Sequence, residues 1–493
     1  MQRIVGRSVF IASLVGAPLG TAVSQTPVAP GAPVAPATQR AAATSDSARG
    51  QSNVLPVLEI GGFLVGLSLY DRIAYANVMQ DGKKVYSSTF ATTWDHLRQQ
   101  TWVHDQDPFN VNQFQHPYQG ATMYAFSRSS GHGFWMSLAN ANIGSFIWKM
   151  AGETDPPSIN DMITTGQAGS LLGEALYRMR DLILKDAGEK PRPFAEYAAA
   201  LISPPGAFNR RVFGDRFKAR LPDTDPATFW QVKFGATVAA LTKEVSTPTS
   251  ILHSDATVDF SMSYGLPGQP GYEYTRPLDY FDFQFTVLMN RSNPIENMMI
   301  RGLLVGAKDG QDPKASSIWG LYGSYDYISP YLFRVSSTAI SLGTTRQYRI
   351  GSDVDLQGSL LGGVGYGAAG STTVIASTPT NAAIRDYHFG VTPQALATFR
   401  LIVADRAMLD VAARDYYVSG LGSDDTSGSE QIFRGQFGLT VRVSGGHAIG
   451  AQFIVSTRDA RYGKLPNRTN AEGTFTLSYS VLGGNLLGAV KSP

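Results

Sequence analysis

The sequence predicts a mainly β protein with α structure: an antiparallel transmembrane β-barrel of about 12 strands that follows an N-terminal helical domain. From residue 229 onward, apolar and polar residues alternate over segments of ten or more positions, the length that a tilted membrane strand needs. The polar positions are rich in Gly, Ser, Thr and Gln, which suits a confined lumen. Aromatic residues gather near segment ends, as in interfacial girdles: Tyr325, Tyr327, Tyr331, Phe333, Tyr416 and Tyr417.

Composition excludes several classes of protein. The 493 residues include 41 basic and 39 acidic side chains and no cysteine. Without Arg3 and Arg7 of the predicted export signal, 39 basic residues face 39 acidic ones, so the chain lacks the basic excess that nucleic-acid binding needs. Disulfides, thiolate nucleophiles and cysteine-ligated zinc are excluded, and we predict no cofactor.

The N-terminus predicts export. Residues 1–24 combine Arg3 and Arg7, an apolar run over 8–19 and small residues before Gln25, which is the pattern of a signal peptide. Residues 25–52 are rich in Pro and Ala and predict a flexible linker. We therefore expect an outer-membrane location in a Gram-negative bacterium. The expected partners are membrane lipids and lipopolysaccharide, with the barrel-assembly machinery during biogenesis.

Residues 53–220 lack the alternation and predict a helical domain. Within them, 166–180 reads as a helix in which Gly169 and Gly173 form a small-xxx-small pair that permits close helix approach. Such weakly hydrophobic helices suit either the periplasmic mouth of the barrel or its lumen, where they would form a plug. We favour partial or full insertion into the lumen.

Residues 229–483 carry the predicted barrel, and 484–493 form a C-terminal tail. Near the end, Phe437, Leu439 and Val441 interleave with Gly438 and Thr440. A soluble β-sandwich would show the same alternation, but its strands would average about five or six residues. The stretch 266–279 is longer than the short periplasmic turn that the strand order predicts there.

One group of motifs resembles a known family. The residues are Trp102, Asp105, Asp107, Phe109, Asn112, Phe114, the run His116-Pro117-Tyr118-Gln119-Gly120, the run from Glu153 through Pro157 to Asp161, Gly169, Gly173 and Glu174. Together they resemble the bacterial family called domain of unknown function 3943, over roughly residues 95–185. The resemblance implies an outer-membrane location and no particular activity. Lys149 departs from the pattern, where we would expect an acidic residue.

Four residues are candidate catalytic groups: His116, Ser158, Asp161 and Glu174. A base, a hydroxyl and a carboxylate suffice for acyl or phosphoryl transfer on a lipid substrate. The structural interpretation is that Ser158 and Asp161 cap a helix while Glu174 pairs with Arg128, Arg178 or Arg180, and we favour it. A metal site at His116, Asp161 and Glu174 is less favoured, and we predict none.

Three functions therefore stay open. The first is an envelope-associated structural or binding role, with the lumen occupied by the helical domain. The second is a lipid-modifying hydrolase or transferase that uses His116 with Ser158, Asp161 or Glu174. The third is a gated channel or exporter.

Overall fold

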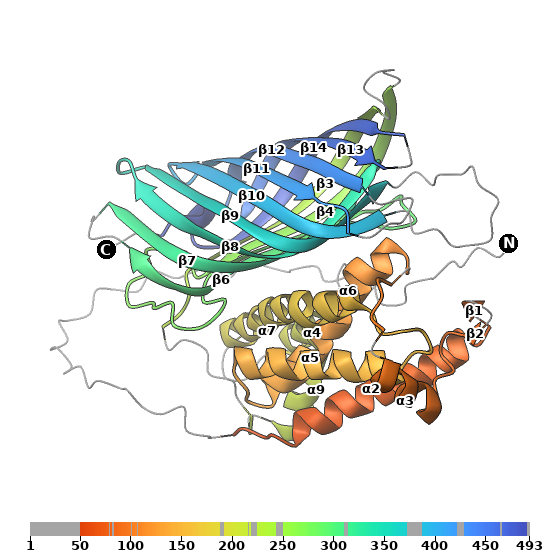
Figure 1. Cartoon of the computed structure of the whole chain (residues 1–493). Coiled ribbons are helices and arrows are strands. Elements are labelled where there is room, and N and C mark those ends of the chain that lie inside the picture. The colour runs from red at the N-terminus through yellow and green to blue at the C-terminus, as the bar shows by residue number, and fades with distance from the viewer. Residues whose placement is uncertain are drawn as a thin grey trace.

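The computed structural model describes residues 50–77, 79–80, 83–99, 101–105, 107–187, 192–214, 216–217, 224–242, 250–309, 314–371, 387–421, 428–463 and 466–490. The predicted signal peptide and most of the predicted linker lie outside these residues. Twelve strands form one closed antiparallel barrel, and helices precede it, which confirms the predicted fold class (Figure 1).

The barrel strands follow one another around the wall in sequence order, and β14 pairs with β3 to close it. Their bounds are β3 Thr228–Thr242, β4 Ser250–Tyr264, β5 Phe281–Leu288, β6 Ile295–Asp309, β7 Ala315–Ile328, β8 Phe333–Arg349, β9 Val354–Ser371, β10 Tyr387–Val403, β11 Ala407–Val418, β12 Gly428–Ser444, β13 His447–Tyr462 and β14 Arg468–Gly484.

The preceding segment is helical apart from a small ladder between β1 (Met79–Gln80) and β2 (Lys83–Lys84). Its helices are α2 Leu55–Ala74, α3 Phe90–Gln99, α4 His116–Ser129, α5 Phe134–Ala151, α6 Ile159–Asp161, α7 Gly169–Asp186, α8 Pro193–Ile202 and α9 Pro204–Phe213, with the π-helices η1 Val111–Gln115 and η2 Met162–Ala168. We call residues 53–214 the helical domain.

The two faces of the barrel wall are identified by their contacts. Arg301 on β6 and Tyr416 on β11 both bond Asp326 on β7, so these side chains meet across the lumen. Side chains of the opposite parity point outward: Phe437 on β12 is 50% exposed and Leu477 on β14 is 57% exposed. The apolar side of the alternation therefore faces outward, as predicted.

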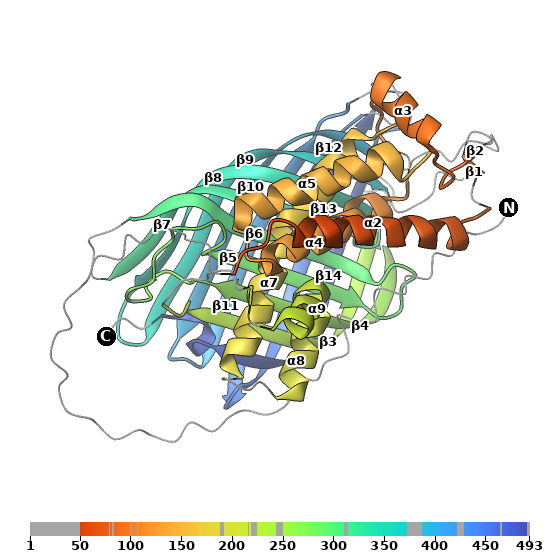
Figure 2. The same cartoon turned by 90° about the horizontal axis from the view of Figure 1, so that it is seen from below.

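The helical domain packs against the outside of the wall, which differs from the predicted lumenal plug. In both views, α4, α5 and α7 lie alongside the barrel strands (Figures 1 and 2). Gly323, on the outward face of β7, lies against Leu171 of α7, and the outward Phe283 and Phe285 of β5 belong to the same apolar core. The described helices thus cover outward side chains of β4–β10, because that face of the wall is apolar while the lumenal face is polar and paired.

This packing also corrects the predicted aromatic girdle. Tyr325 and Tyr327 point outward but are fully buried beneath the helical domain, and the Tyr325 hydroxyl donates to the Gln113 carbonyl. Phe333 and Tyr416 belong to a separate apolar cluster with inward-facing residues. Among the predicted girdle residues, Tyr417 has an exposed side chain, with 42% of its surface accessible. Period-two alternation cannot tell an aromatic covered by lipid from one covered by protein.

The chain itself occupies the mouth of the barrel at which β3 begins and β14 ends. Leu266, at the start of the long connection 265–280, packs there with Phe229 and with Leu487 and Val490 of the C-terminal tail. The Val490 carbonyl accepts hydrogen bonds from Gln347 Nε2 at 2.7 Å and from Arg349 Nη2 at 3.1 Å. The described part of the tail is therefore bound at the mouth.

Candidate functional site

The helical domain holds two buried clusters of charged side chains. The first, which we call the His116 cluster, comprises His116, Lys149, Glu153, Ser158, Asn160 and Asp161. The second, which we call the Glu174 cluster, comprises Tyr124, Arg128, Glu174, Arg178 and, from the barrel, Asp279. Three of the four candidate catalytic residues lie in the first cluster and Glu174 lies in the second.

Asp161 is the centre of the His116 cluster and has no exposed surface. Its Oδ1 lies 3.0 Å from His116 Nδ1 and accepts from Asn160 Nδ2 at 2.6 Å. Its Oδ2 lies 2.6 Å from Lys149 Nζ and accepts from the Ser158 hydroxyl. Both carboxylate oxygens are thus used by neighbouring side chains.

Local sequence places these groups. Pro157 and Ser158 run extended beside Val103: the Val103 N–H donates to the Pro157 carbonyl at 3.0 Å, and the Ile159 N–H donates to the Val103 carbonyl at 2.9 Å. Ser158 occupies the N-cap position of α6 as predicted, but its hydroxyl donates to the Asp161 carboxylate and makes no cap bond to the backbone. The expected side-chain cap of α6 by Ser158 is therefore not formed.

Lys149 supplies the charge that the cluster needs. Its ammonium lies 2.7 Å from Glu153 Oε2 as well as 2.6 Å from Asp161, and Trp148 Nε1 donates to Glu153 Oε1 at 2.7 Å. Burial alone would raise the pKa of Asp161, but His116 and Lys149 outweigh it and lower that pKa. Burial would lower the pKa of His116, and Asp161 more than offsets it, so that pKa is raised. Lys149, the residue that departs from the family pattern, is thus part of a network of paired charges.

The cluster continues to the barrel through Asn112. With its amide oriented to satisfy its neighbours, Asn112 donates to Asp105 Oδ2 at 3.1 Å and to Asp161 Oδ1 at 3.0 Å, and accepts from the Tyr387 hydroxyl at 2.7 Å. Tyr387 is the first residue of β10. The Asp107 carbonyl also lies 2.6 Å from that hydroxyl. A barrel residue therefore joins the candidate site.

The Glu174 cluster joins two helices and the barrel. Glu174, wholly buried, accepts from Arg128 Nε at 2.7 Å, Arg178 Nε at 2.8 Å and the Tyr124 hydroxyl at 2.8 Å. Burial opposes its ionisation, but the two guanidinium groups lower the pKa of Glu174 to about 2. Arg178 also bonds Asp279, near the end of the 265–280 connection, at 2.9 Å. Arg128 and Arg178 are partners as predicted, whereas Arg180 pairs with Asp181.

Small residues let the helices meet. A side chain at Gly120 would lie 1.7 Å from the Thr165 carbonyl oxygen, and one at Gly169 would lie 2.7 Å from Gly120 Cα. At Gly173 a side chain would press on the Tyr124 ring at 2.8 Å. The predicted close approach is thus present, between α4 and the η2–α7 segment. Pro117 lies in the first turn of α4, where a missing N–H is tolerated.

The arrangement is better suited to holding structure than to nucleophilic catalysis. A serine is activated as a nucleophile when its hydroxyl donates a hydrogen bond to the base. The Ser158 hydroxyl donates instead to the Asp161 carboxylate, which lies between Ser158 and His116. Catalysis by His116, Ser158, Asp161 and Glu174 stays a prediction. Within the described residues, no group of three or more His, Asp and Glu side chains could hold a metal ion.

Asp107 predicts a pH dependence for the helical domain. Burial and the neighbouring Asp105 raise the pKa of Asp107 to about 8. Between about pH 4 and pH 8, Asp107 is therefore protonated in the folded state and ionised in the unfolded state. The free energy of unfolding falls as the pH rises through this range. Because Asp107 is partly exposed, we expect a loss of about 1–2 kcal/mol between pH 5 and pH 8.

Proteolysis of the native protein at both pH values measures this loss. Asp107→Asn should flatten the dependence, and Asp95→Asn, at an exposed position on α3, should leave it unchanged. An unchanged slope in Asp107→Asn would refute the assignment.

The sequence did not reveal the contributions of Tyr387 and Asp279, or the charge pairing of Lys149. Tyr387 follows a long connection and gave no sign of contact with residues 107–112. Lys149 was noticed as a departure, but its role depends on α5 packing beside α6. Tyr387 is distant in sequence from the helical domain, so no local pattern could have identified it.

Comparison with known families supports the resemblance drawn from the motifs. Residues 101–205 match the family model described as domain of unknown function (DUF3943). That range contains both the His116 cluster and all members of the Glu174 cluster except Asp279. A search of curated proteins finds no match.

Solved structures resemble the chain over about half its length. An outer-membrane channel from Pseudomonas putida F1 is 10% identical, with a TM-score of 0.27, over 53% of this chain and 96% of that one. The NanC porin is 8% identical, with a TM-score of 0.25, over 50% and 98%. The outer-membrane channel DcaP of Acinetobacter baumannii is 6% identical, with a TM-score of 0.23, over 53% and 100%. Each of these three likenesses has a TM-score below 0.5.

Proposed function

We propose that this chain, whose residues 101–205 match the DUF3943 model, is an outer-membrane protein whose helical domain lies in the lipid layer beside the barrel. Its function is to bind or act on membrane lipid at the helical domain. The observation that carries this proposal is the packing of apolar helices on the outward, lipid-facing side of the barrel wall.

The outer faces of α2 and α5 support it. Both helices point large apolar side chains away from the barrel, each at least 40% exposed: Val57, Leu58, Val65, Leu69, Ile73, Trp135, Met136, Ile143, Phe146 and Ile147. Of their charged residues, Asp71 and Lys149 are buried, Glu59 is half-buried and Arg72 is exposed. None of the described helices is both long and apolar enough to cross a membrane.

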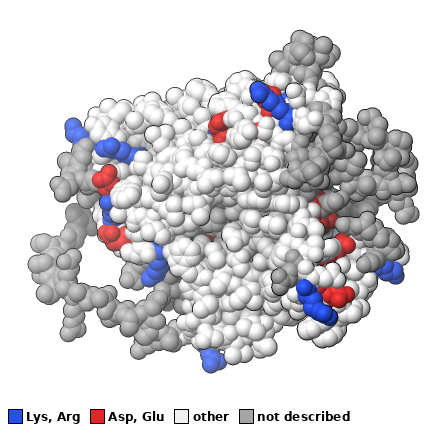
Figure 3. Space-filling view, in the orientation of Figure 1, with Lys and Arg blue, Asp and Glu red and all other residues white. Residues whose placement is uncertain are grey.

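The surface as a whole supports the same placement. On the face shown in Figure 3, most charged residues lie toward the left and right ends, and the broad area between them is largely uncharged over barrel and helices alike. A shared uncharged band is expected if both parts contact lipid. The buried clusters fit this setting, because charged groups within a membrane must pair with one another.

The lumen gives less support to a channel. Besides the Arg301–Asp326–Tyr416 group, Arg434 on β12 bonds Glu296 on β6 at 2.7 Å, so paired side chains cross the interior. The C-terminal tail occupies one mouth. We therefore place the function at the helices rather than in transport.

The absence of cysteine allows a direct test. Single variants Val65→Cys and Ile143→Cys place one thiol on the outer face of α2 or α5, and Leu477→Cys marks the lipid-facing wall. In membrane fragments open on both sides, we expect all three to resist a water-soluble maleimide, whereas Ser352→Cys in the exposed β8–β9 turn reacts fully. The Ser352→Cys thiol should react fully without added detergent.

Labelling of Val65→Cys and Ile143→Cys at the rate of Ser352→Cys would overturn the proposal. If the placement holds, lipid mass spectrometry of outer membranes with wild type, His116→Ala or no protein separates binding from modification. A lipid that changes chemically with wild type but not with folded His116→Ala would indicate an enzyme. Enrichment of an unmodified lipid with both variants would indicate binding.

A further inference from the structure

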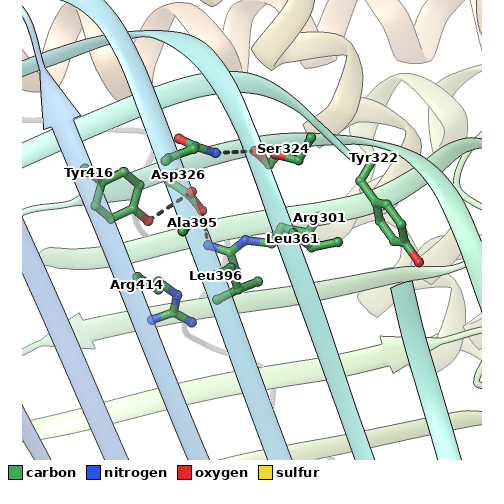
Figure 4. Close-up of a pocket in the computed structure, with 11 residues that line it drawn as sticks. Arg301, Tyr322, Ser324, Asp326, Leu361, Ala395, Leu396, Arg414 and Tyr416 are labelled. Atoms are coloured by element: carbon green, nitrogen blue, oxygen red, sulfur yellow. Dashed lines mark hydrogen bonds and ion pairs between the residues drawn. The ribbon is translucent and has the colours of Figure 1, made fainter. Parts of the chain in front are cut away.

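The lumen of the barrel contains a cavity that the proposed function does not use. Its volume is about 160 Å³, and it extends from Phe229 and Leu266, near the mouth at which β3 begins, to Arg414 on β11. A narrower pocket continues from there between Arg301, Asp326 and Arg414 (Figure 4). Arg301 and Arg414 line both spaces.

Most lumenal cations around this cavity have a carboxylate partner. The pairs are Arg301–Asp326 at 2.6 Å, Arg400–Asp410 at 2.5 Å, Arg434–Glu296 at 2.7 Å and Lys233–Asp259 at 3.4 Å. This pairing is expected, because an ionised group in a confined interior is costly unless a counter-charge meets it.

Arg414 departs from this pattern. Its side chain is 6% exposed, and its guanidinium forms no hydrogen bond or ion pair with any described residue. Asp326, which lines the same pocket, already bonds Arg301 at 2.6 Å and the Tyr416 hydroxyl at 3.0 Å. In Figure 4 dashed lines reach Asp326 from both of these neighbours and none reaches Arg414. Among the described residues, no carboxylate forms an ion pair or hydrogen bond with this buried, always-charged group, which lies beside open space.

We propose that Arg414, with Arg301 beside it, forms a lumenal binding site for a small oxyanion, a carboxylate or a phosphate. The planar guanidinium presents a fork of N–H donors that matches both anions. The adjoining cavity provides the space, and its extension toward the mouth provides a route of entry. The bound anion supplies the direct ionic partner that the described residues do not give Arg414.

Calorimetric titration of the full chain in detergent tests the site, with inorganic phosphate and succinate as probes at constant ionic strength in chloride. We expect saturable binding of at least one probe and a loss of about tenfold or more in Arg414→Gln, the value of a charge-assisted hydrogen bond. Arg461→Gln, whose side chain is 73% exposed, is the matched control and should bind as wild type does. Which probe binds identifies the anion; binding of neither, or equal binding by Arg414→Gln, overturns the proposal.

Thermal unfolding tests whether a loss of binding in an Arg414 variant comes from misfolding. Without oxyanions, Arg414→Met should unfold at the wild-type temperature or above, because it removes an unpaired buried charge. Added phosphate or succinate should raise the midpoint of wild type and leave Arg414→Met unchanged. A lower midpoint of Arg414→Met in chloride alone would show that Arg414 stabilises the protein through its own contacts, which would overturn the proposal.

Discussion

Replacing Glu174 with Gln is expected to destabilise the helical domain by about 3–5 kcal/mol, since it leaves the buried Arg128 and Arg178 without their shared carboxylate. Glu174 is wholly buried and bonds both guanidinium groups at 3.0 Å or less. Asp279 would still pair with Arg178, so the larger share of the loss falls on Arg128. Because backbone hydrogen bonds between the strands hold the barrel together without the helices, we expect the helices to detach before the barrel unfolds.

Limited proteolysis with parallel gel mobility measures both events. In Glu174→Gln, residues 53–214 should be cleaved rapidly while the barrel keeps its folded mobility. Lys185→Gln breaks an exposed pair with Asp225, 58% and 68% exposed, and should cost about 0.5 kcal/mol or less. The double variant Arg128→Met/Glu174→Gln should lose less than the sum of its single variants. A loss below about 1 kcal/mol in Glu174→Gln would contradict the role given to this cluster.

Replacing Gly120 with Ala is expected to cost on the order of 3 kcal/mol, at the upper end for overpacking. The added methyl group would lie 1.7 Å from the Thr165 carbonyl oxygen and 3.1 Å from Gly169 Cα. These are backbone atoms, so no side chain can rotate away, and α4 must move off the η2–α7 segment. Separation there would also strain the contact of Arg128 with Glu174.

Gly62→Ala is the matched control, because nothing lies within 4 Å of a side chain at Gly62 on α2. It should stabilise the helix by about 0.5–1 kcal/mol through the lower flexibility of the unfolded chain. Denaturant unfolding that follows the helical signal compares the two variants. Equal stability of Gly120→Ala and wild type would contradict the close packing of α4 against η2.

The barrel could be predicted from sequence because its pattern is local. Phe437, Leu439 and Val441 alternate with small or polar neighbours, and outward exposure of the apolar side chains follows from the two-residue period alone. The twelve strands follow from counting such segments. The Gly169–Gly173 pair likewise predicted a close helix contact, because only residue size decides how near two backbones can come.

The candidate site could be predicted only in part. Motif resemblance identified His116, Ser158, Asp161 and Glu174, yet it could not show that Glu174 belongs to a separate cluster. Asp161 and Glu174 are 13 residues apart, and a π-helix lies between them over Met162–Ala168. The widened turn changes the rotation along the segment, so helical spacing counted from sequence does not apply there.

The sequence by itself determined the barrel, its outward apolar face, and the family motifs over roughly residues 95–185. Only the tertiary structure decided that the helices lie outside the wall, and that Tyr387 and Asp279 of the barrel complete the two clusters. The physical reason is that an apolar side chain gains from leaving water whether lipid or protein covers it. Phe283 on β5 and Phe437 on β12 therefore look alike in sequence, and only the packing of α7 distinguishes them.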